Sequence, residues 1–151
     1  MANRRPTLYR FDAMPRQTVL GGRLERTALR SDGAIVTLNW FRPGSSRVEP
    51  HNHPFDQLSF IFEGTLIFEI DGEQIEAGPG SALRIPSGAM HTAWPKGDQV
   101  VLNVDVFAPI RSDYLFLTAH QDDEFADRSA GPAPTTGFAG AADDGKQGGK
   151  R

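Results

Sequence analysis

The stretch GSSRVEPHNHPFDQLSFIFEG, residues 44–64, decides the fold of this chain. Its second half is an apolar, largely aromatic run, Leu58–Phe62, which stops before Gly64. A run of this kind with a glycine stop is typical of a short β-strand. Its first half carries His51 and His53, which face the same side of an extended chain because side chains alternate along a strand. Both imidazoles can therefore reach one point.

Short runs of similar character lie on both sides of this stretch. We expect strands at Ala34–Phe41, Thr65–Ile70, Ala82–Ile85 and Val100–Phe107. The pair Asp71-Gly72 is a strong signal for a two-residue hairpin turn. Short strands separated by glycine and proline at intervals of about eight to twelve residues predict an all-β sandwich or barrel. The segment Asp113–Phe125 fits either one short helix or an extended edge.

The composition fits one domain and excludes several kinds of chemistry. The chain has 151 residues, a formal net charge of -3 and no cysteine. This length allows one domain with a real core, and the near-balanced charge gives no support to a nucleic-acid-binding protein. Without cysteine, thiol catalysis and thiolate metal sites are excluded, so histidine, carboxylate and amide groups remain as metal ligands.

The last segment, Ser129–Arg151, consists mostly of glycine, alanine, proline, small polar and charged residues. Such a segment cannot bury enough apolar surface to offset the entropy of ordering it. We therefore predict one barrel domain at residues 8–128, with its motif core at 44–107, and a disordered tail at 129–151. The sequence shows no convincing signal peptide and no apolar run of membrane-spanning length, so we expect a cytoplasmic protein without a membrane partner.

Several predicted strands are apolar on both faces. Leu58, Phe60 and Phe62 point one way, and Ile61 points the other. An antiparallel sheet with one wet face would alternate cleanly between apolar and polar residues. We therefore expect these strands to be covered on both sides, by a second sheet or by another subunit, and we predict a homodimer.

A third histidine extends the pair of the opening stretch. His91 lies 34 residues beyond Gln57, behind a turn at residues 86–88. Gln57 keeps the parity of His51 and His53 if the strand runs on, and a hairpin return could bring His91 opposite them. Three imidazoles and one amide oxygen would then surround a cation. Two nearby histidines are by themselves a weak signal, because such pairs are common on surface loops.

The spacing around these residues resembles the two motifs of a known family, the cupins. The matching runs are Gly44-x6-His51-x-His53-x3-Gln57-x6-Gly64 and Gly80-x5-Pro86-x-Gly88-x2-His91. The resemblance implies a small double-stranded β-helix, or jelly-roll, barrel with a metal inside its mouth. Three features depart from the pattern. Gln57 replaces a common glutamate, the spacing after Gly44 is one residue longer than usual, and Pro95 replaces an asparagine often found after the last histidine.

The glutamine bears on the chemistry of the expected site. A glutamate would reduce the charge of a divalent site to about +1, whereas neutral Gln57 leaves the full +2. The site then lacks the carboxylate of the two-histidine-one-carboxylate iron oxygenases and favours Lewis-acid chemistry on an anionic substrate or enolate. Imidazole and amide ligands suit one divalent transition metal ion, and Ni, Fe, Mn and Zn all remain open.

Among cupins, the chain resembles the small pectin-degradation members that convert unsaturated uronates to linear keto sugars. The resemblance rests on three segments: LGGRLER at 20–26, HNHPFDQ at 51–57 and DVFAPIR at 105–111. It implies that Asp105, Phe107 and Arg111 surround the substrate, with Asp105 passing protons, Arg111 binding a carboxylate and Phe107 forming an apolar wall. Alternation alone favours a different interpretation, in which the valines of this strand point inward and Asn103 and Asp105 outward.

Four functions follow from this reasoning. The first is a metal-dependent enzyme for isomerisation or ring opening of a small carbonyl or unsaturated uronate-type substrate, which can be anionic. The second is an iron or nickel dioxygenase acting on a phenolic or diketone substrate, and the third is an aromatic polyketide cyclase. The fourth is a ligand-binding cupin without activity. A flat substrate of a cyclase would suit the aromatic residues Trp40, Phe60, Trp94 and Phe107.

Two further residues carry chemistry but have no supporting spacing. Arg84, between Leu83 and Ile85, is a second candidate partner for a substrate carboxylate. We expect it instead to be a barrel-wall residue paired across strands. His120 has no partner at ligand spacing, and we expect a solvated surface histidine.

Overall fold

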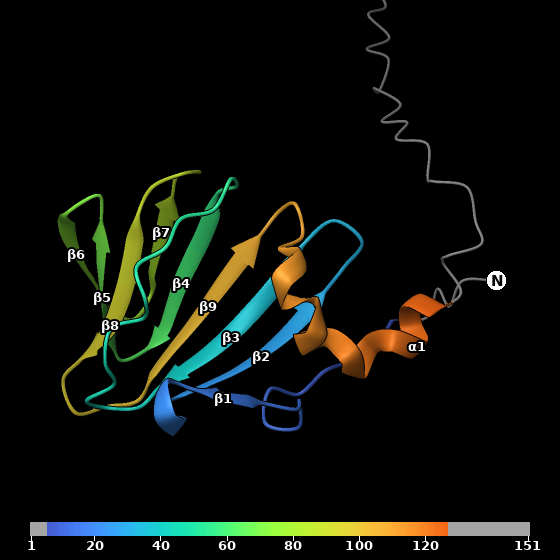
Figure 1. The fold of residues 1–151 in the computed structure, drawn as a ribbon. Helices are drawn as coiled ribbons and strands as arrows, with labels where there is room; N and C mark the ends of the chain where they lie inside the picture. The colour runs from blue at the N-terminus through green and yellow to red at the C-terminus, as the bar shows by residue number, and fades with distance from the viewer. Residues whose placement is uncertain (1–5, 127–151) are drawn as a thin grey trace, which may run out of the picture.

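The computed structural model describes residues 6–126 and shows a mostly β-stranded chain (Figure 1). The strands of these residues are β1 (Gln17–Val19), β2 (Leu24–Arg30), β3 (Ile35–Phe41), β4 (Gln57–Glu63), β5 (Thr65–Ile70), β6 (Glu73–Ala77), β7 (Ser81–Ile85), β8 (His91–Lys96) and β9 (Val101–Phe107). The helical segments are short: η1 (Leu20–Gly22) and η2 (Ser112–Gln121) are 3-10 helices and α1 (Asp122–Phe125) is one α-helical turn. No helix among the described residues has the length and apolar character needed to cross a membrane.

The strands form two antiparallel sheets that lie opposite each other (Figure 1). The larger sheet has the order β1-β2-β3-β9-β4-β7, and the smaller sheet has the order β6-β5-β8. Strands that are distant in sequence become neighbours, because β9 inserts between β3 and β4. This crossing order is that of a jelly-roll barrel, so the predicted all-β barrel is confirmed.

The predicted strands are confirmed with small shifts at their ends. The run expected at 34–41 begins at Ile35, and the run expected at 100–107 begins at Val101. The hairpin at Asp71-Gly72 joins β5 to β6. The segment Asp113–Phe125 is helical, mostly as a 3-10 helix, rather than an extended edge.

Four strands, β1, β2, β6 and β8, are additions to the predicted set. β2 reads LERTALR, whose charges hide the strand pattern, although Leu24 and Ala28 are buried on one face. β8 contains Pro95, which would disrupt a central strand because proline has no N–H to donate. It is tolerated here because β8 is an edge strand of the smaller sheet.

The two faces of β4 have different surroundings. Gln57, Ser59 and Ile61 are buried toward the barrel interior, whereas Leu58 and Phe62 are 42% and 58% exposed. Within a single chain no second sheet covers the outer face of β4, so the expected covering of that face depends on another subunit. The predicted homodimer would cover the open face and stays a prediction, as do the domain limits 8–128. The predicted tail at 129–151 lies outside the described residues.

Two apolar clusters flank the barrel interior. One lies between the sheets and includes Phe41, Ile61, Leu66 and Phe68. The other consists of Ala28, Ile35, Phe107 and Leu117, so it joins β2, β3, β9 and η2. Each cluster contributes side chains to the same internal cavity, which therefore lies between them.

Position 64, at the end of the opening stretch, requires glycine for steric reasons. Gly64 has φ 69°, in the left-handed region that favours glycine. A Cβ atom at this position would lie 2.8 Å from the carbonyl oxygen of Val100. Any side chain at position 64 would therefore push β9 away from the turn between β4 and β5.

Candidate functional site

The histidine segment is fixed to the start of β8 by backbone hydrogen bonds. The N–H of His51 donates to the carbonyl of His91 (3.0 Å), and the N–H of His91 donates to the carbonyl of His51 (2.9 Å). The N–H of Gly88 donates to the carbonyl of His53 (2.9 Å). Two motifs separated in the sequence thus meet at one place, as the hairpin argument predicts.

Each of the three imidazoles is oriented by a backbone carbonyl. The Nδ1 atoms of His51, His53 and His91 lie 2.8, 2.8 and 2.9 Å from the carbonyl oxygens of Glu49, Phe55 and Ala89. A carbonyl oxygen only accepts, so each Nδ1 carries the proton and each Nε2 keeps its lone pair. Second-shell bonds of this kind fix the tautomer that binds a metal.

The remaining ring nitrogens converge on one point. One nitrogen from each of the three histidines lies within 4.8 Å of the others. The Nε2 of His91 is buried and has no hydrogen-bond partner among the described residues. The Nε2 of His53 lies 3.2 Å from Oε1 of Gln57, which places two acceptor atoms against each other. A cation satisfies all of these atoms at once, so the residues fit a metal site.

The pKa values of two of these histidines favour the neutral, metal-binding form. Burial lowers the pKa of His51 below 6.5; the Glu49 hydrogen bond partly offsets this, and the charges of Arg111 and Arg26 lower it further. Burial also lowers the pKa of His91, against the hydrogen bond to Ala89. Both imidazoles thus keep their lone pairs at lower pH than a solvated histidine does.

A hydrogen-bonded chain leads from Gln57 to Asp105. The Nε2 of Gln57 donates to the Ser59 hydroxyl (3.1 Å), and that hydroxyl donates to Oδ1 of Asp105. The serine hydroxyl has one proton, so its direction is set by the carboxylate, which only accepts. This chain turns the amide so that Oε1 of Gln57 faces the histidines.

Two asparagines hold the Asp105 carboxylate. The side-chain amide of Asn103 donates to Oδ1 (3.0 Å), and that of Asn39 donates to Oδ2 (3.2 Å). With the Ser59 hydroxyl, Oδ1 receives two donors, whereas Oδ2 receives one. Since each carboxylate oxygen has two lone pairs, Oδ2 keeps acceptor capacity for a ligand proton.

Arg111 precedes η2 and lies over two aromatic rings. Its guanidinium carbon is 3.9 Å from the ring centroid of Tyr114 and 5.2 Å from that of Phe107. Its Nε and Nη2 donate to Asp113 (3.0 and 3.1 Å), while Nη1 is buried without a hydrogen-bond partner among the described residues. One donor of a charged group is therefore free for an anion.

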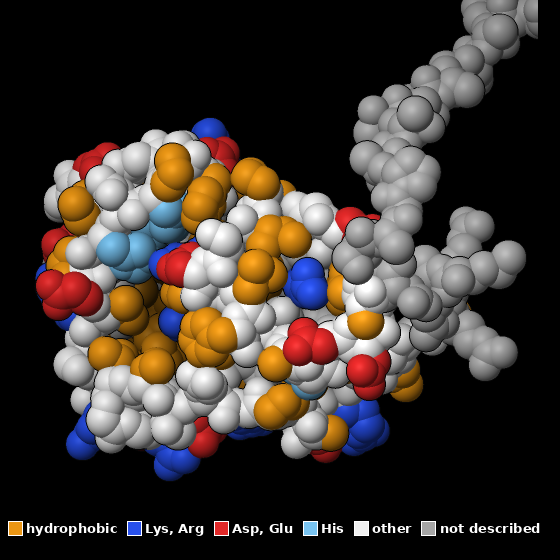
Figure 2. Space-filling view, turned by 45° about the vertical axis from the view of Figure 1, so that its right-hand side comes forward, with side chains coloured by type: hydrophobic (Ala, Val, Ile, Leu, Met, Phe, Trp, Pro, Cys, Tyr) orange, Lys and Arg blue, Asp and Glu red, His pale blue; other side chains and the backbone are white. Residues whose placement is uncertain are grey.

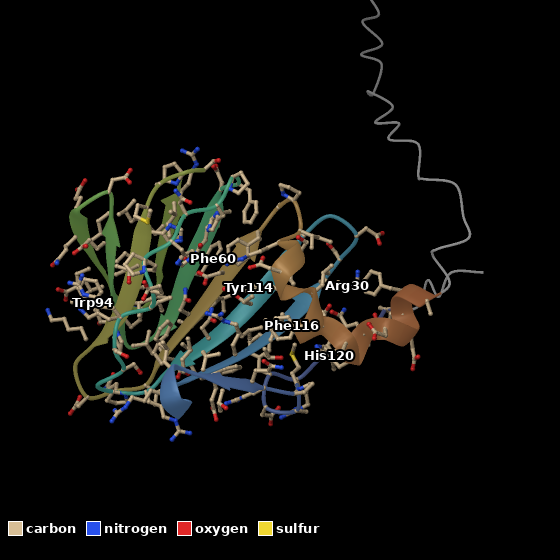
Figure 3. All side chains as sticks on the ribbon, in the orientation of Figure 1. Arg30, Phe60, Trp94, Tyr114, Phe116 and His120 are labelled. Atoms are coloured by element: carbon tan, nitrogen blue, oxygen red, sulfur yellow. The ribbon has the colours of Figure 1, made fainter. Side chains whose placement is uncertain are left out.

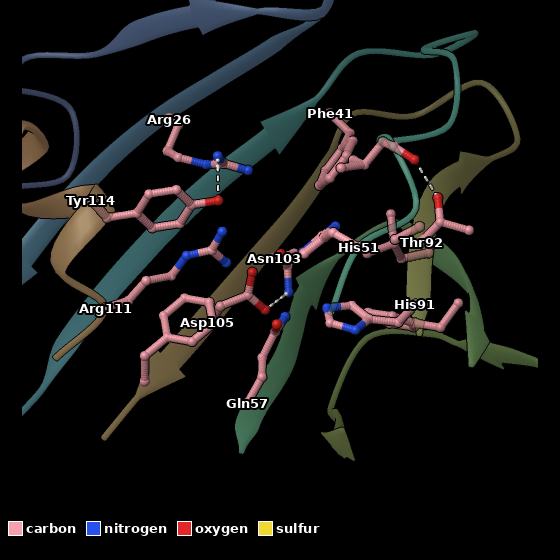
Figure 4. A pocket seen from close by; sticks show the side chains of 15 residues that line it. Arg26, Phe41, His51, Gln57, His91, Thr92, Asn103, Asp105, Arg111 and Tyr114 are labelled. Atoms are coloured by element: carbon pink, nitrogen blue, oxygen red, sulfur yellow. Dashed lines mark hydrogen bonds between the residues drawn. The ribbon is translucent and has the colours of Figure 1, made fainter. Parts of the chain in front are cut away.

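His51, His91 and Gln57 line one cavity together with Asp105, Arg111 and Phe107. Figure 4 shows His51, His91 and Gln57 on one side, Arg26, Tyr114 and Arg111 on the other, and Asp105 between them. In the space-filling view, histidine side chains lie at the rim of a hollow whose wall is hydrophobic (Figure 2). The polar face of β9 thus points inward with Phe107, so the interpretation based on alternation alone is wrong.

A sequence comparison assigns part of this chain to a known family. Residues 40–107 match the model of the cupin domain. These residues are a cupin domain. The match covers both histidine motifs and ends at Phe107, the last residue of β9. No curated protein sequence matches the chain.

Solved cupin structures share the fold at low sequence identity. KdgF from Halomonas sp. is 23% identical, with a TM-score of 0.64, over 72% of this chain and 98% of that one. An RmlC-like cupin from Shewanella frigidimarina is 22% identical, with a TM-score of 0.63, over 73% and 96%. A predicted oxalate decarboxylase from Thermotoga maritima is 18% identical, with a TM-score of 0.62, over 68% and 99%. The predicted cupin barrel is confirmed.

Two cavity residues lie outside the set of site residues that the sequence predicts. Arg26 lies on β2 and Tyr114 on η2, and both line the cavity with the histidines. A signal for Arg26 exists in its parity, because it shares a strand face with the buried Leu24 and Ala28. Tyr114 offers no such signal, since its segment has no strand or helix period to orient it.

The aromatic residues proposed for a flat substrate do not gather at the cavity. Phe107 is the one of the four that lines it. Trp40 and Trp94 are covered by Arg16 and Arg47 at 3.7 and 3.8 Å from their ring centroids. Figure 3 shows Trp94 on β8, far from Tyr114. Trp40, Phe60 and Trp94 therefore give no support to the flat substrate of an aromatic polyketide cyclase.

The two remaining candidates lie outside the cavity. Nε of Arg84 donates to Asp56 (2.7 Å) on the outer face of the barrel, which confirms the expected wall residue. The expectation of a solvated His120 is wrong. Its Nε2 lies 2.8 Å from the carbonyl oxygen of Ala28, and its ring packs edge-on against Tyr9. His120 attaches η2 to β2 at a distance from the site (Figure 3).

Proposed function

We propose that this cupin is a metal-dependent enzyme that isomerises or ring-opens a small carbonyl compound carrying a carboxylate, with an unsaturated uronate as the lead substrate. One observation carries the proposal. A free acceptor on Asp105 and a free donor on Arg111 line the same cavity as His51 and His91, whose ring nitrogens converge with that of His53. The resemblance of the 20–26, 51–57 and 105–111 segments to the pectin-degradation cupins supports the uronate class.

His51, His53, His91 and Gln57 would hold the metal. All four ligands are neutral, so a divalent ion keeps its full charge and, when bound, polarises a hydroxyl or carbonyl oxygen. The nitrogen and oxygen donors suit Ni, Fe, Mn or Zn. Backbone carbonyls orient the three rings, so the site needs little rearrangement to take up the ion.

Asp105 is the proton-transfer group of the proposed reaction. Its Oδ2 can accept a proton from a carbon or hydroxyl beside the substrate carbonyl and return it at another atom. Isomerisation and ring opening both need such a transfer without net gain or loss of protons. The donors Ser59, Asn103 and Asn39 keep the carboxylate in one orientation while the proton moves.

Arg111 and Phe107 position the substrate. The unpaired Nη1 of Arg111 can donate to a substrate carboxylate, while Asp113 holds the rest of the guanidinium in place. Phe107 is 1% exposed and offers an apolar surface beside Asp105, which keeps water away from the reacting carbon.

An ultraviolet assay on unsaturated galacturonate tests the proposal. We expect loss of the carbon–carbon double-bond absorbance with metal-loaded protein, and much slower loss with metal-stripped protein. Arg84→Gln is a matched control, because Arg84 is paired with Asp56 outside the cavity. Equal rates with and without metal-loaded protein would exclude this substrate. Oxygen uptake by the iron-loaded protein would favour the dioxygenase alternative.

We also propose that the chain forms a homodimer through the outer face of β4. Leu58 and Phe62 are 42% and 58% exposed there, and burying them would stabilise an association by the hydrophobic effect. Light scattering should give twice the monomer mass for the natural chain and the monomer mass for Leu58→Lys combined with Phe62→Lys. A monomeric natural chain would contradict this proposal.

A further inference from the structure

Arg26 is a half-buried cation whose partners are neutral. It lies in the middle of β2 and lines the cavity together with His51 and Asp105. Its Nε donates to Oδ1 of Asn39 (2.5 Å) and its Nη1 donates to the hydroxyl of Tyr114 (3.0 Å). Among the described residues, no carboxylate lies within ion-pair distance of it. Buried charges are usually paired, so this position favours an anion supplied by a ligand.

Tyr114 is held so that its own proton is free. Its hydroxyl oxygen accepts from Arg26, so its O–H points to another acceptor. Its ring lies between two guanidinium groups, 5.0 Å from Arg26 and 3.9 Å from Arg111. The aromatic ring keeps these two like charges apart while it binds both by cation–π contact.

The three side chains form one wall of the cavity. Figure 4 shows the Arg26 guanidinium, the Tyr114 hydroxyl and the Arg111 guanidinium next to one another, opposite His51 and His91. The wall therefore offers three groups to a ligand: the charge of Arg26, the hydroxyl of Tyr114, and Nη1 of Arg111, which has no hydrogen-bond partner among the described residues. The one carboxylate that lines this cavity, Asp105, already accepts three side-chain donors.

We propose that Arg26 and Tyr114 extend the Arg111 contact into a carboxylate-binding wall, and that they select ligands with a carboxylate at the end remote from the histidines. Two charged donors and one hydroxyl can bind both oxygens of a planar carboxylate. The neutral carbonyl or hydroxyl oxygens of the same ligand then face His51, His91 and Gln57. This selection deepens the proposed function and rests on it for the choice of sugar acid.

Calorimetric titration with two matched sugars tests the wall without turnover. D-Galacturonate carries the carboxylate and D-galactose does not, and neither is the unsaturated substrate. We expect galacturonate to bind the natural chain and galactose to bind at least about tenfold more weakly, because charge-assisted hydrogen bonds are lost. Failure of the natural chain to prefer the acid would overturn the proposal, whatever the uronate turnover assay gives.

Two variants separate binding by Arg26 from a purely structural role. Arg26→Gln should weaken galacturonate binding about 10- to 100-fold, and Tyr114→Phe about 2- to 10-fold. Galactose and Ni²⁺ affinity should be unchanged in both, because the histidines lie on the opposite side. Equal losses for acid, neutral sugar and Ni²⁺ would show that Arg26 only braces Asn39, and unchanged galacturonate binding would equally overturn the proposal.

Matched controls distinguish a loss of galacturonate binding from a loss of folding. Arg84→Gln removes the same charge from the outer face and should leave galacturonate binding unchanged. Circular dichroism melting compares the folding of each variant. If Arg26→Gln does not fold, Arg26→Lys keeps the charge but loses the planar fork of donors, and it should still prefer the acid with reduced affinity. Full acid affinity in this variant, or no preference for the acid, would contradict the wall.

Discussion

On the histidine side of the cavity, each ring is oriented by a carbonyl only two residues away in the chain. On the arginine side, Arg26 is held by Asn39 and Tyr114, which lie 13 and 88 residues away. The first side is therefore built from local sequence, and the second from long-range contacts. This difference explains why a short motif reveals the histidine cluster while Arg26 and Tyr114 stay hidden.

Asp105 lies between the two sides of the cavity, and we expect its loss to have the largest effect on turnover. We expect Asp105→Asn to lower kcat on the unsaturated uronate about 10²- to 10⁴-fold, the size of a lost general acid–base group. Ni²⁺ and galacturonate affinity should change little, since neither side loses a donor. Steady-state kinetics and calorimetry measure both quantities. A kcat within about twofold of the natural chain would remove Asp105 from the reaction.

Removal of one imidazole should affect the histidine side alone. His91→Ala deletes the buried Nε2, which has no hydrogen-bond partner within residues 6–126, and we expect Ni²⁺ affinity to fall by about 100-fold or more. Competition with a metal chelator gives this affinity, and galacturonate binding to the metal-free protein serves as the internal control. A variant that retains full metal affinity would show that the cluster does not bind the ion.

A negative charge at position 57 should change both metal binding on the histidine side and galacturonate binding on the arginine side. Gln57→Glu adds a negative charge beside His53, so metal affinity should rise about tenfold, as expected for a unit charge a few ångströms from the ion. Galacturonate binding to the metal-loaded protein should weaken, because the net charge of the site falls. The natural chain is the matched neutral reference, because glutamine and glutamate have the same length and shape. Stronger galacturonate binding in the glutamate variant would contradict this charge argument.

The smallest expected effect is on the way the free energy of unfolding depends on pH. The pKa values of His51 and His91 lie below 6.5, mainly through burial, so the unfolded chain takes up these protons more readily than the folded chain. The free energy of unfolding of the metal-free protein should be unaffected by these groups above pH 6.5. It should fall as the pH drops from 6.5 to the lower folded values, and then level off. Denaturant titrations of the natural chain and of His51→Gln check the sign. The free energy of unfolding should fall less with decreasing pH in the variant, and a steeper fall would contradict the prediction.

The fold and the site differ in how far the sequence predicts them. β4, β5, β7 and β9 follow from apolar runs between glycine and proline, whereas β2 offers no such run because Glu25, Arg26 and Thr27 follow one another in its sequence. The polar face of β9 was placed outward by alternation, although Asn103 and Asp105 are buried. Alternation gives two faces and cannot say which one is inside when the interior of a barrel is polar.

The sequence by itself determined the jelly-roll class, the three histidines that cluster and the parity that brings His51 and His53 to one side. These features depend on local geometry: alternation along an extended chain, and glycine where a left-handed turn is required, as at Gly64. Only the tertiary structure decided that Arg26 and Tyr114 belong to the same cavity. Their contact joins β2 to η2 across 88 residues, and no local rule sets the distance between two segments that meet through packing.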